Sequence, residues 1–600
     1  MNYLNELNEA QRAPVVHKDG AVMVIAGAGS GKTRVLTYRI AYLIQQGVDP
    51  FNILALTFTN KAAREMKERI GRIVGPSEAR NLWMGTFHSV FARILREEAS
   101  KLGFPRDFTI YDQQDSQRLI SAIIKEMGLD KEVYKYKQIA SRISSYKNNL
   151  ITVKAYYENP ELQEADAMAK RPRLGDIYAN YVDRCFKAGA MDFDDLLLRT
   201  NELLNVFPEV LAKYQHRFRY ILVDEYQDTN HSQYLIVRAL ADRFQNICVV
   251  GDDAQSIYAF RGANIDNIFN FQKDYPNVGV YRLEQNYRST KNIVEAANNV
   301  IEHNKARLEK VVWTDNESGN RIKVHRSPTD ADEGRFVAGT IFESAMQEQL
   351  PYGNFAVLYR TNSQSRAIED ALRKRDIPYR IYGGLSFYQR KEIKDILAYF
   401  RLVINENDEE ALQRVINFPA RGIGDSTMEK LTLCANEFKL PIFEIIKNLE
   451  VMDYGLKINS ATRVRLLEFA NMILSFRIMM ETQDAFTLAE HIAKRTGILN
   501  EFKKDGTPEG VERMQNIEEL LNGIRDFVEG QEQVEEEGNS LAEFLQDVAL
   551  ATDMDKEVED ENRVSLMTIH LAKGLEFPHV FIVGMEEDLF PSALSQNTRT

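Results

Sequence analysis

Hydrophobic residues follow two different periods along the chain, and the change of period divides it into blocks. Through residues 1–110, short apolar runs such as 21–26 and 53–59 alternate with long amphipathic helical patterns. Short runs that are apolar throughout are typical of strands buried on both faces, as in βαβ units around a parallel sheet. The pattern therefore predicts an α/β fold for this block.

Helical patterns interrupt this alternation twice. Residues 111–190 are predicted to be almost entirely helical and are basic and rich in tyrosine, but strand patterns return at 220–223 and 246–251. The first helical block is therefore predicted to be inserted into the first α/β unit. A second helical block lies within a second α/β unit. The strands of that unit are predicted at residues 321–325, 355–359, 564–569 and 580–583.

The resulting fold class is α/β, with two parallel-sheet domains that are each interrupted by a mainly helical insertion. The first domain is predicted at residues 1–110 and 191–284, around an insertion at 111–190. The second is predicted at residues 285–384 and 551–600, around an insertion at 385–550.

Composition excludes several classes of protein. With 600 residues, 44% of them hydrophobic, the chain can bury several cores and is not a disordered protein. Because it lacks both a run of about 18 apolar residues and a signal-peptide pattern, we expect a cytoplasmic protein without a membrane partner. The three cysteines, Cys185, Cys248 and Cys434, are too far apart for a disulfide framework or a zinc knuckle.

The formal net charge of −13 at first argues against a nucleic-acid partner. However, residues 529–561 contain thirteen Asp or Glu residues and one lysine, Lys556, so most of the negative charge lies there. Local basic grooves elsewhere remain compatible with an anionic ligand. The acidic run at 535–537 is predicted to be a solvated loop, because like charges resist packing.

A glycine-rich loop gives the strongest chemical signal. It follows the apolar run at 21–26 and precedes a helical pattern that starts near Arg34, and it reads Ala26, Gly27, Ala28, Gly29, Ser30, Gly31, Lys32 and Thr33. In such loops, backbone N–H groups surround phosphate oxygens, the lysine reaches the terminal phosphates and the hydroxyl binds Mg²⁺. The alternative is a glycine turn that only joins a strand to a helix.

Two adjacent acids supply what hydrolysis of a bound nucleotide needs. Asp224 and Glu225 directly follow the apolar run at 220–223. Asp224 is predicted to hold Mg²⁺, and Glu225 to orient and deprotonate the attacking water. The alternative is an exposed acidic pair in a loop. A second acidic cluster, Asp192, Asp194 and Asp195, has no apolar strand pattern before it and is a weaker metal candidate.

The order of further blocks resembles that of the UvrD, PcrA and Rep group of superfamily-one DNA helicases. The resemblance extends through nearly the whole chain and rests on seven motifs in addition to the glycine-rich loop. They are residues 7–12 (LNEAQR), 57–63 (TFTNKAA), 85–89 (GTFHS), 224–228 (DEYQD), 251–262 (GDDAQSIYAFRG), 285–289 (QNYRS) and 568–577 (TIHLAKGLEF).

The resemblance implies two RecA-like motor domains that use ATP and Mg²⁺ to move 3′ to 5′ along single-stranded DNA. It implies that Gln11 reads the adenine edge and that Tyr287 and Arg34 sandwich the base. Arg288 would act as an arginine finger, Gln255 would sense the γ-phosphate, and Glu576 would approach the ribose. The alternatives are a core tyrosine, a surface ion pair at Arg288 and a charge on a helix surface at Glu576.

The resemblance also implies a DNA path, since translocation without regard to sequence requires aromatic faces for stacking and donors for phosphates. The implied contacts are Phe58, Thr59, Asn60, Phe87, His88, Phe193, Tyr258, Phe260, Arg261 and His570. A loop at Gly422, Ile423 and Gly424 resembles one that offers N–H groups to duplex phosphates, although a turn before a capped helix needs the same residues. The basic stretch at 134–147 is either a further DNA contact or a solvated helix face.

Family members carry a sixth motif beyond the point that matches residues 589–592, and this motif supplies a second arginine for the γ-phosphate. The resemblance therefore implies that these 600 residues bind ATP but hydrolyse it poorly. The expected activity is that of an ATP-dependent DNA helicase, and the alternative is a nucleotide-gated DNA clamp with little ATPase activity. Expected partners are single-stranded DNA, single/double-strand junctions and DNA repair or replication proteins, with a monomeric or weakly self-associating chain.

Overall fold

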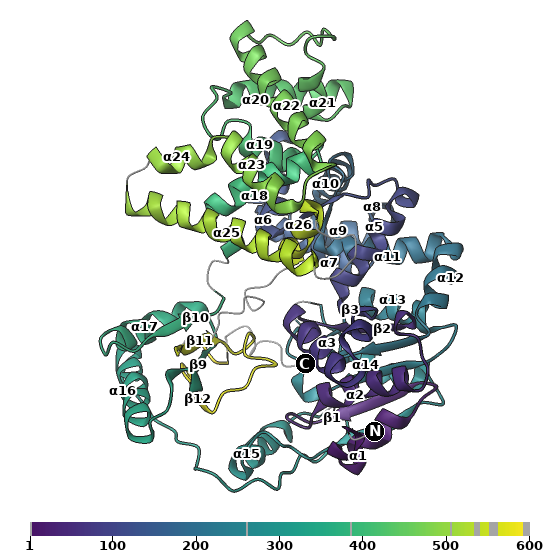
Figure 1. The fold of residues 1–600 in the computed structure, drawn as a ribbon, viewed down its shortest axis with the longest axis vertical. Coiled ribbons are helices and arrows are strands. Elements are labelled where there is room, and N and C mark those ends of the chain that lie inside the picture. The colour runs from purple at the N-terminus through teal and green to yellow at the C-terminus, as the bar shows by residue number, and fades with distance from the viewer. Residues whose placement is uncertain are drawn as a thin grey trace. The chain divides into compact units, whose positions relative to one another are not determined.

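The computed structural model describes residues 3–259, 262–305, 307–383, 387–504, 507–532, 540–550 and 562–591. The chain forms two compact units (Figure 1). The first comprises Met1–Arg288, Asn304–Val312 and Arg390–Ala551, and the second comprises Ser289–His303, Trp313–Gln389 and Thr552–Thr600. The acidic run at 535–537 lies outside the described residues.

A six-stranded parallel sheet forms the centre of the first unit; the sequence predicted the parallel sheet and four of these strands, but not β3 and β8. Its strand order is β3-β2-β6-β7-β1-β8. The strands are β1 (Val22–Ala26), β2 (Ile53–Thr57), β3 (Trp83–Thr86), β6 (Tyr220–Val223), β7 (Ile247–Gly251) and β8 (Gly279–Leu283). The helices beside this sheet in sequence are α1 (Glu9–Val16), α2 (Lys32–Gln45), α3 (Asn60–Val74), α4 (Pro76–Arg80), α5 (Phe87–Glu98), α11 (Phe193–Val206), α12 (Pro208–Arg217), α13 (His231–Ala241) and α14 (Asp266–Asp274).

Alternate residues of the central strands enter two separate cores. In β1, Met23 and Ile25 belong to one buried cluster, whereas Val22 and Val24 belong to the other. Successive side chains of a strand point to opposite faces, so the two clusters cover the two faces of the sheet. This double burial explains why the strand sequences are continuously apolar rather than alternating.

The first insertion has a core of its own and a short two-stranded parallel base. The strands β4 (Thr109–Tyr111) and β5 (Ala190–Asp192) pair where the chain enters and leaves the insertion. The sequence patterns did not reveal either strand, because each has only three residues. The helices between them are α6 (Gln113–Glu126), α7 (Tyr136–Asn148), α8 (Val153–Tyr157), α9 (Pro160–Met168) and α10 (Leu174–Lys187). The prediction of an almost entirely helical block is confirmed.

The second helical block was predicted at 385–550, and its described residues are mainly helical; its first helices pack on the base of the first insertion. Lys394 Nζ lies 2.7 Å from Asp112 Oδ2, and Arg401 lies 2.8 Å from Asp115 Oδ2. Asn405 donates a 2.8 Å hydrogen bond to the carbonyl of Ala188. The helices are α18 (Lys391–Ile404), α19 (Glu409–Val415), α20 (Asp425–Phe438), α21 (Ile442–Lys447), α22 (Ser460–Met480), α23 (Ala485–Arg495), α24 (Ile498–Lys504), α25 (Pro508–Glu532) and α26 (Leu541–Leu550).

The second unit contains a four-stranded parallel sheet in the order β10-β11-β9-β12. Its strands are β9 (Phe355–Tyr359), β10 (Tyr379–Ile381), β11 (Val564–Thr568) and β12 (His579–Ile582), and its helices are α15 (Lys291–Ile301), α16 (Asp330–Glu348) and α17 (Ser365–Arg373). The predicted strand at 321–325 is wrong: these residues are exposed, have no regular secondary structure and pair with no strand of the described chain. The segment alternates basic and apolar residues, and without a ladder partner it does not form a strand.

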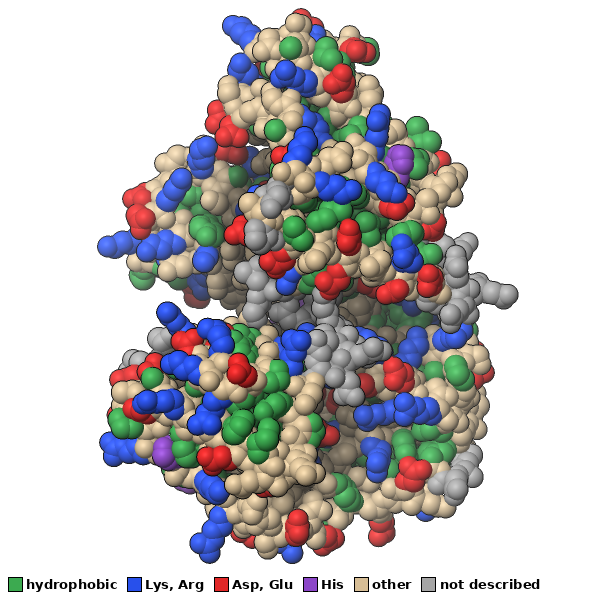
Figure 2. All heavy atoms as spheres, turned by 60° about the vertical axis from the view of Figure 1, so that its left-hand side comes forward, with side chains coloured by type: hydrophobic (Ala, Val, Ile, Leu, Met, Phe, Trp, Pro, Cys, Tyr) green, Lys and Arg blue, Asp and Glu red, His purple; other side chains and the backbone are tan. Residues whose placement is uncertain are grey.

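No described helix is both long and apolar enough to span a bilayer. On the face shown in Figure 2, lysine and arginine side chains are interspersed with aspartate and glutamate. Surface charge on this face therefore does not by itself identify a nucleic-acid interface.

Lys147 is buried between carboxylates where α7 meets the start of α11. Its Nζ lies 2.7 Å from Asp192 Oδ2 and 2.8 Å from Asp195 Oδ2, and its side chain is fully inaccessible. Burial lowers the pKa of Lys147, but the two carboxylates outweigh burial and raise it. Because a lysine already supplies the cation, the acidic cluster is a structural network. Lys147 also lies at the end of the basic stretch at 134–147, so this residue is part of the core rather than of a DNA-binding surface.

Replacing Lys147 with methionine would leave Asp192 and Asp195 buried without a cation. Breaking a buried ion pair by removing one partner typically costs about 3–5 kcal/mol. We expect Lys147→Met to lower the free energy of unfolding by this amount in urea titrations followed by circular dichroism. Lys154→Met is the matched control, because Lys154 pairs with Glu158 at the surface and should contribute less than about 1 kcal/mol. Equal stability of the two variants would contradict the structural role of Lys147.

Candidate nucleotide-binding site

The glycine-rich loop joins β1 to α2 in the predicted strand, loop and helix order. Gly29 and Gly31 have φ values of 66° and 85°, in the left-handed region that residues with a Cβ rarely adopt. Ser30 Oγ donates a 2.7 Å hydrogen bond to the carbonyl of Gly27, which fixes the turn. The loop therefore ends at the amino end of α2, where unpaired N–H groups and the helix dipole favour an anion.

Lys32 is the first residue of α2 and is held by side chains that follow two other strands. Its Nζ lies 3.1 Å from Glu225 Oε1 and donates to Gln255 Oε1 at 3.2 Å. Burial lowers the pKa of Lys32, but the charges of Glu225, Asp252 and Asp224 outweigh it and raise the pKa. Lys32 is therefore a firmly protonated cation at the place where the terminal phosphates of a nucleotide would bind.

The acid pair lies at the carboxyl end of β6, beside β2 and β7 in the sheet. Asp224 is buried, and its backbone N–H donates to the carbonyl of Leu56 at 2.9 Å. Glu225 has φ 49° and ψ 42°, a left-handed conformation that is costly for a residue with a side chain. The chain therefore turns sharply between the end of β6 and the short 3₁₀ helix Tyr226–Asp228.

Gln227 and Asp252, for which no role was predicted, join Lys32, Glu225 and Gln255 in a closed ring of contacts. The amide of Gln227 donates to Glu225 Oε2 at 2.6 Å and accepts from the backbone N–H of Asp252 at 3.0 Å. Asp252 Oδ2 in turn accepts from Gln255 Nε2 at 2.8 Å. The ring therefore runs from Lys32 through Glu225, Gln227, Asp252 and Gln255 back to Lys32. Both additions lie within recognised motifs, but only their three-dimensional contacts reveal what they do.

The predicted adenine-binding residues converge on the same loop. Gln11 is buried in α1 and donates from Nε2 to the carbonyl of Ser30 at 2.9 Å. The backbone N–H of Tyr287 donates to the carbonyl of Gly29 at 3.0 Å, while the Tyr287 ring is half exposed. Asn286, which sequence reasoning missed, donates to the carbonyl of Ala28 at 2.7 Å. The segment after β8 therefore lies directly on the phosphate loop.

The remaining predicted nucleotide contacts differ in exposure. Thr33 is half buried and lies next to Lys32, whereas Arg34 and Arg288 are exposed in the first unit. Glu576 is exposed in the second unit, in the segment between β11 and β12, and His570 lies in the turn directly after β11. No group of three or more metal-ligating side chains occurs among the described residues.

Several predicted DNA contacts cluster where β2, β3 and β5 end. The Phe58 ring packs 5.4 Å from that of Phe87, and the His88 ring meets Phe193 edge to face at 5.6 Å. Phe87 is only 1% exposed, so its ring supports Phe58 from within the core instead of offering a stacking face. Burial lowers the pKa of His88 to about 4, so His88 is a neutral side chain at physiological pH.

Two other predicted DNA contacts, Thr59 and Asn60, form hydrogen bonds within the protein. The Thr59 hydroxyl caps α3 by accepting from the N–H of Ala62, and Asn60 donates to the carbonyl of Leu550 at 2.9 Å. Tyr258 is half buried, and Phe260 and Arg261 lie outside the described residues.

The loop at Gly422, Ile423 and Gly424 precedes α20, as predicted. Gly422 has φ 70°, and Ile423 is buried. The N–H of Ile423 already donates to Asn417 Oδ1 at 3.1 Å, so this donor has an internal partner. The structure therefore gives this loop a local role in the turn before α20.

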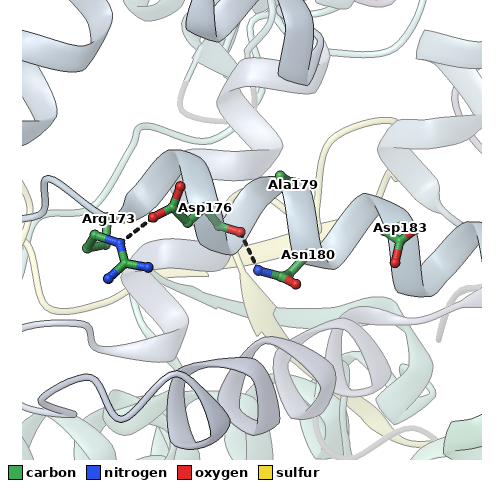
Figure 3. A pocket seen from close by; sticks show the side chains of 5 residues that line it. All are labelled: Arg173, Asp176, Ala179, Asn180 and Asp183. Atoms are coloured by element: carbon green, nitrogen blue, oxygen red, sulfur yellow. Dashed lines mark hydrogen bonds and ion pairs between the residues drawn. The ribbon is translucent and has the colours of Figure 1, made fainter. Parts of the chain in front are cut away.

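A shallow surface hollow along α10 is a poor candidate for a ligand site (Figure 3). Arg173 pairs with Asp176, and Asn180 donates to the carbonyl of Asp176 at 2.9 Å. The lining comes from one helix and uses these polar groups for internal contacts. The phosphate loop and the ring around Lys32 therefore remain the candidate site.

Comparison with known proteins agrees with this geometry. Residues 7–276 match the model of the UvrD/REP helicase N-terminal domain, and residues 281–600 match that of the UvrD-like helicase C-terminal domain. The chain is 44% identical to the ATP-dependent DNA helicase PcrA of Bacillus subtilis, over 99% of this chain and 80% of that protein. It is 42% identical to PcrA of Staphylococcus aureus, over 98% of this chain and 78% of that protein.

Substitutions at Lys32 and Glu225 should separate nucleotide binding from hydrolysis. Lys32→Ala removes the cation of the loop and is expected nearly to abolish nucleotide binding or hydrolysis. Glu225→Gln keeps the shape of the side chain but removes the base, so hydrolysis should fall by about 10²–10⁴-fold while binding persists. Calorimetric titration and phosphate release measure the two effects.

The exposed residue Glu158 provides a control substitution, Glu158→Gln, that should change neither quantity. Parent-like behaviour of both site variants would mean that the nucleotide site lies elsewhere.

Proposed function

The chain belongs to the UvrD/Rep helicase family, and from this premise we propose that its phosphate-loop site drives movement along single-stranded DNA in the 3′-to-5′ direction. The protein is an ATP-dependent DNA helicase, as are the PcrA relatives that share nearly its whole length. The observation that carries the proposal is the contact of Lys32 with both Glu225 and Gln255 beside the glycine-rich loop.

The residues of the site fit a nucleoside triphosphate with Mg²⁺. The loop leaves no room for side chains at Gly29 and Gly31, where an added Cβ would lie 2.6 Å from Asn286 Nδ2 and 2.8 Å from Gln11 Nε2. Thr33 and Asp224 are the side chains that would hold Mg²⁺. The ion would neutralise the charge that develops on the transferred phosphoryl group.

Glu225 is proposed to be the general base that deprotonates the attacking water. Both of its carboxylate oxygens have partners, so one of these contacts must break before Glu225 can accept a proton from water. One of its oxygens pairs with Lys32 and the other accepts from Gln227. A terminal phosphate at Lys32 competes with Glu225 for the ammonium group, which frees a carboxylate oxygen for a water molecule. Gln255, on the other side of Lys32, is positioned to respond to the same phosphate.

The DNA contacts are proposed to lie at the carboxyl ends of β2, β3 and β5. Phe58 and Phe193 provide aromatic faces, and neutral His88, which packs against Phe193, provides a polar contact. Stacking is worth about 1–3 kcal/mol per base and does not depend on base identity. We propose that single/double-strand junctions and DNA repair or replication proteins are the partners, and that the chain acts as a monomer or a weakly associating species.

A nucleotide-gated clamp with little ATPase activity is not favoured. Both domain models that match the chain describe helicases, and the relatives covering it almost completely are ATP-dependent DNA helicases. The ring of contacts that joins Lys32 to Glu225, Gln227, Asp252 and Gln255 also supports hydrolysis.

Steady-state ATP hydrolysis with Mg²⁺, with and without single-stranded DNA, tests the proposed function. It should be measured on the 600-residue chain and on a version extended to the full length of its PcrA relatives. We expect both to bind ATP and DNA, and we expect DNA to stimulate the extended version by at least about tenfold, or 1.4 kcal/mol of barrier. Binding without stimulation in either version would favour the clamp.

Phe193→Ala tests the proposed DNA path. Loss of one stacking face should weaken single-stranded DNA binding by about 1–3 kcal/mol, measured by fluorescence anisotropy, and should leave nucleotide affinity unchanged without DNA. Phe186→Ala is the matched control, because Phe186 is an exposed aromatic residue on α10 that packs on Phe104. An equal loss of DNA affinity in both variants would remove Phe193 from the path.

A further inference from the structure

A nine-residue segment, Asn304–Val312, belongs to the first unit although both of its neighbours in sequence belong to the second. We call it the strap. The chain reaches the strap from Ser289–His303 and continues from it into Trp313–Gln389. The strap is therefore joined covalently to the second unit at both of its ends.

The described residues of the strap are fastened next to the nucleotide site by polar contacts. The N–H of Leu308 donates to Asp253 Oδ2 at 3.0 Å, and the N–H of Val311 donates to Glu284 Oε1 at 2.9 Å. Val312 reaches the phosphate loop itself, because a Cβ added to Gly27 would lie 2.6 Å from Val312 Cγ2. The end of the strap is thus in contact with the loop that binds phosphate.

Lys310 makes the most buried of these contacts. Its Nζ lies 2.8 Å from Asp252 Oδ1 and also pairs with Asp253. The three side chains are 8%, 2% and 3% exposed, so little water is available to replace any of them. An ion pair in such surroundings holds its partners in a defined geometry, because separation leaves charges without compensation.

The second oxygen of Asp252 connects Lys310 to the nucleotide site. Asp252 Oδ2 accepts from Gln255 Nε2 at 2.8 Å, and the oxygen of the same Gln255 amide accepts from Lys32 at 3.2 Å. The contact with Asp252 determines which end of the Gln255 amide faces Lys32. Two hydrogen bonds and one ion pair thus join the phosphate-binding lysine to the strap.

We propose that Lys310 is a positioning residue for nucleotide sensing, acting through Asp252 on Gln255 and linking the state of the terminal phosphate to the strap. The inference rests on the proposed function, because it takes Gln255 as the side chain that responds to the γ-phosphate. In this proposal Lys310 sets how strongly the site prefers a nucleoside triphosphate over a nucleoside diphosphate. General affinity for nucleotide comes from the loop and Lys32.

The test compares the dissociation constants of Mg²⁺-ADP and of a non-hydrolysable Mg²⁺-ATP analogue, measured by calorimetry without DNA. Lys310→Met should reduce the preference for the triphosphate by about fivefold or more, the lower end of typical coupling between sites. Lys310→Arg retains a cation between the carboxylates and should restore the parent preference to within about twofold. A purely structural role would weaken both nucleotides equally.

A double-mutant cycle that combines Lys310→Met with Gln255→Ala tests whether Lys310 acts through Gln255. If Lys310 acts through Gln255, the double variant should differ from Gln255→Ala by less than about twofold, whereas independent effects would add. Additive effects would overturn the proposal. So would an unchanged preference in either single variant. These outcomes are separate from failure of the proposed function, which is measured by DNA-stimulated hydrolysis.

Lys147→Met controls for the general effect of losing a buried lysine. Lys147 also bridges two aspartates, but it lies in a network that does not include the phosphate loop. Its loss should leave the preference between the two nucleotides unchanged, and an equal shift would overturn the proposal. If Lys310→Met does not fold, Asp253→Asn removes one partner of Lys310 and keeps an acceptor for Leu308 N–H. It should shift the preference in the same direction, and an unchanged value would likewise overturn the proposal.

Discussion

The parallel direction of six strands is the constraint on which the candidate site depends. In a parallel sheet all carboxyl ends meet at one edge, so segments far apart in sequence arrive side by side. The phosphate loop follows β1, the acid pair follows β6, Asp252 follows β7 and Glu284 begins the segment after β8. The order of strands places β6, β7 and β1 together, which explains why Lys32 meets Glu225 and Gln255.

Patterns that report on local structure allowed much of the fold to be predicted. Continuous apolar runs predicted β6 and β9 with their observed bounds, because strands buried on both faces leave a clear signal. The segment at 321–325, in which Ile322 and Val324 alternate with basic residues, was also predicted as a strand but has no partner strand in the described chain. The three-residue strands β4 and β5 gave almost none. Strand formation depends on a neighbour, and a local pattern does not contain that information.

The candidate site was predictable where a motif specifies chemistry by itself, as at Lys32, Asp224 and Glu225. The partners Gln227 and Lys310 were not predictable, because a glutamine or a lysine is common on any surface. Lys147 shows the same limit, since it appeared within a basic stretch and is buried between two aspartates. Charged residues reveal their roles only when folding shows which opposite charges they meet.

The pairing of β4 with β5 determines how the first insertion is attached to the first unit. They bring the entry and the exit of the first insertion together, with Thr109 beside Ala190. The chain between these positions contributes its own core and leaves the six-stranded sheet intact. The chain between these two strands can therefore vary in length without displacing the strands of the sheet, as long as the contacts of the insertion with α11 and α18 are retained.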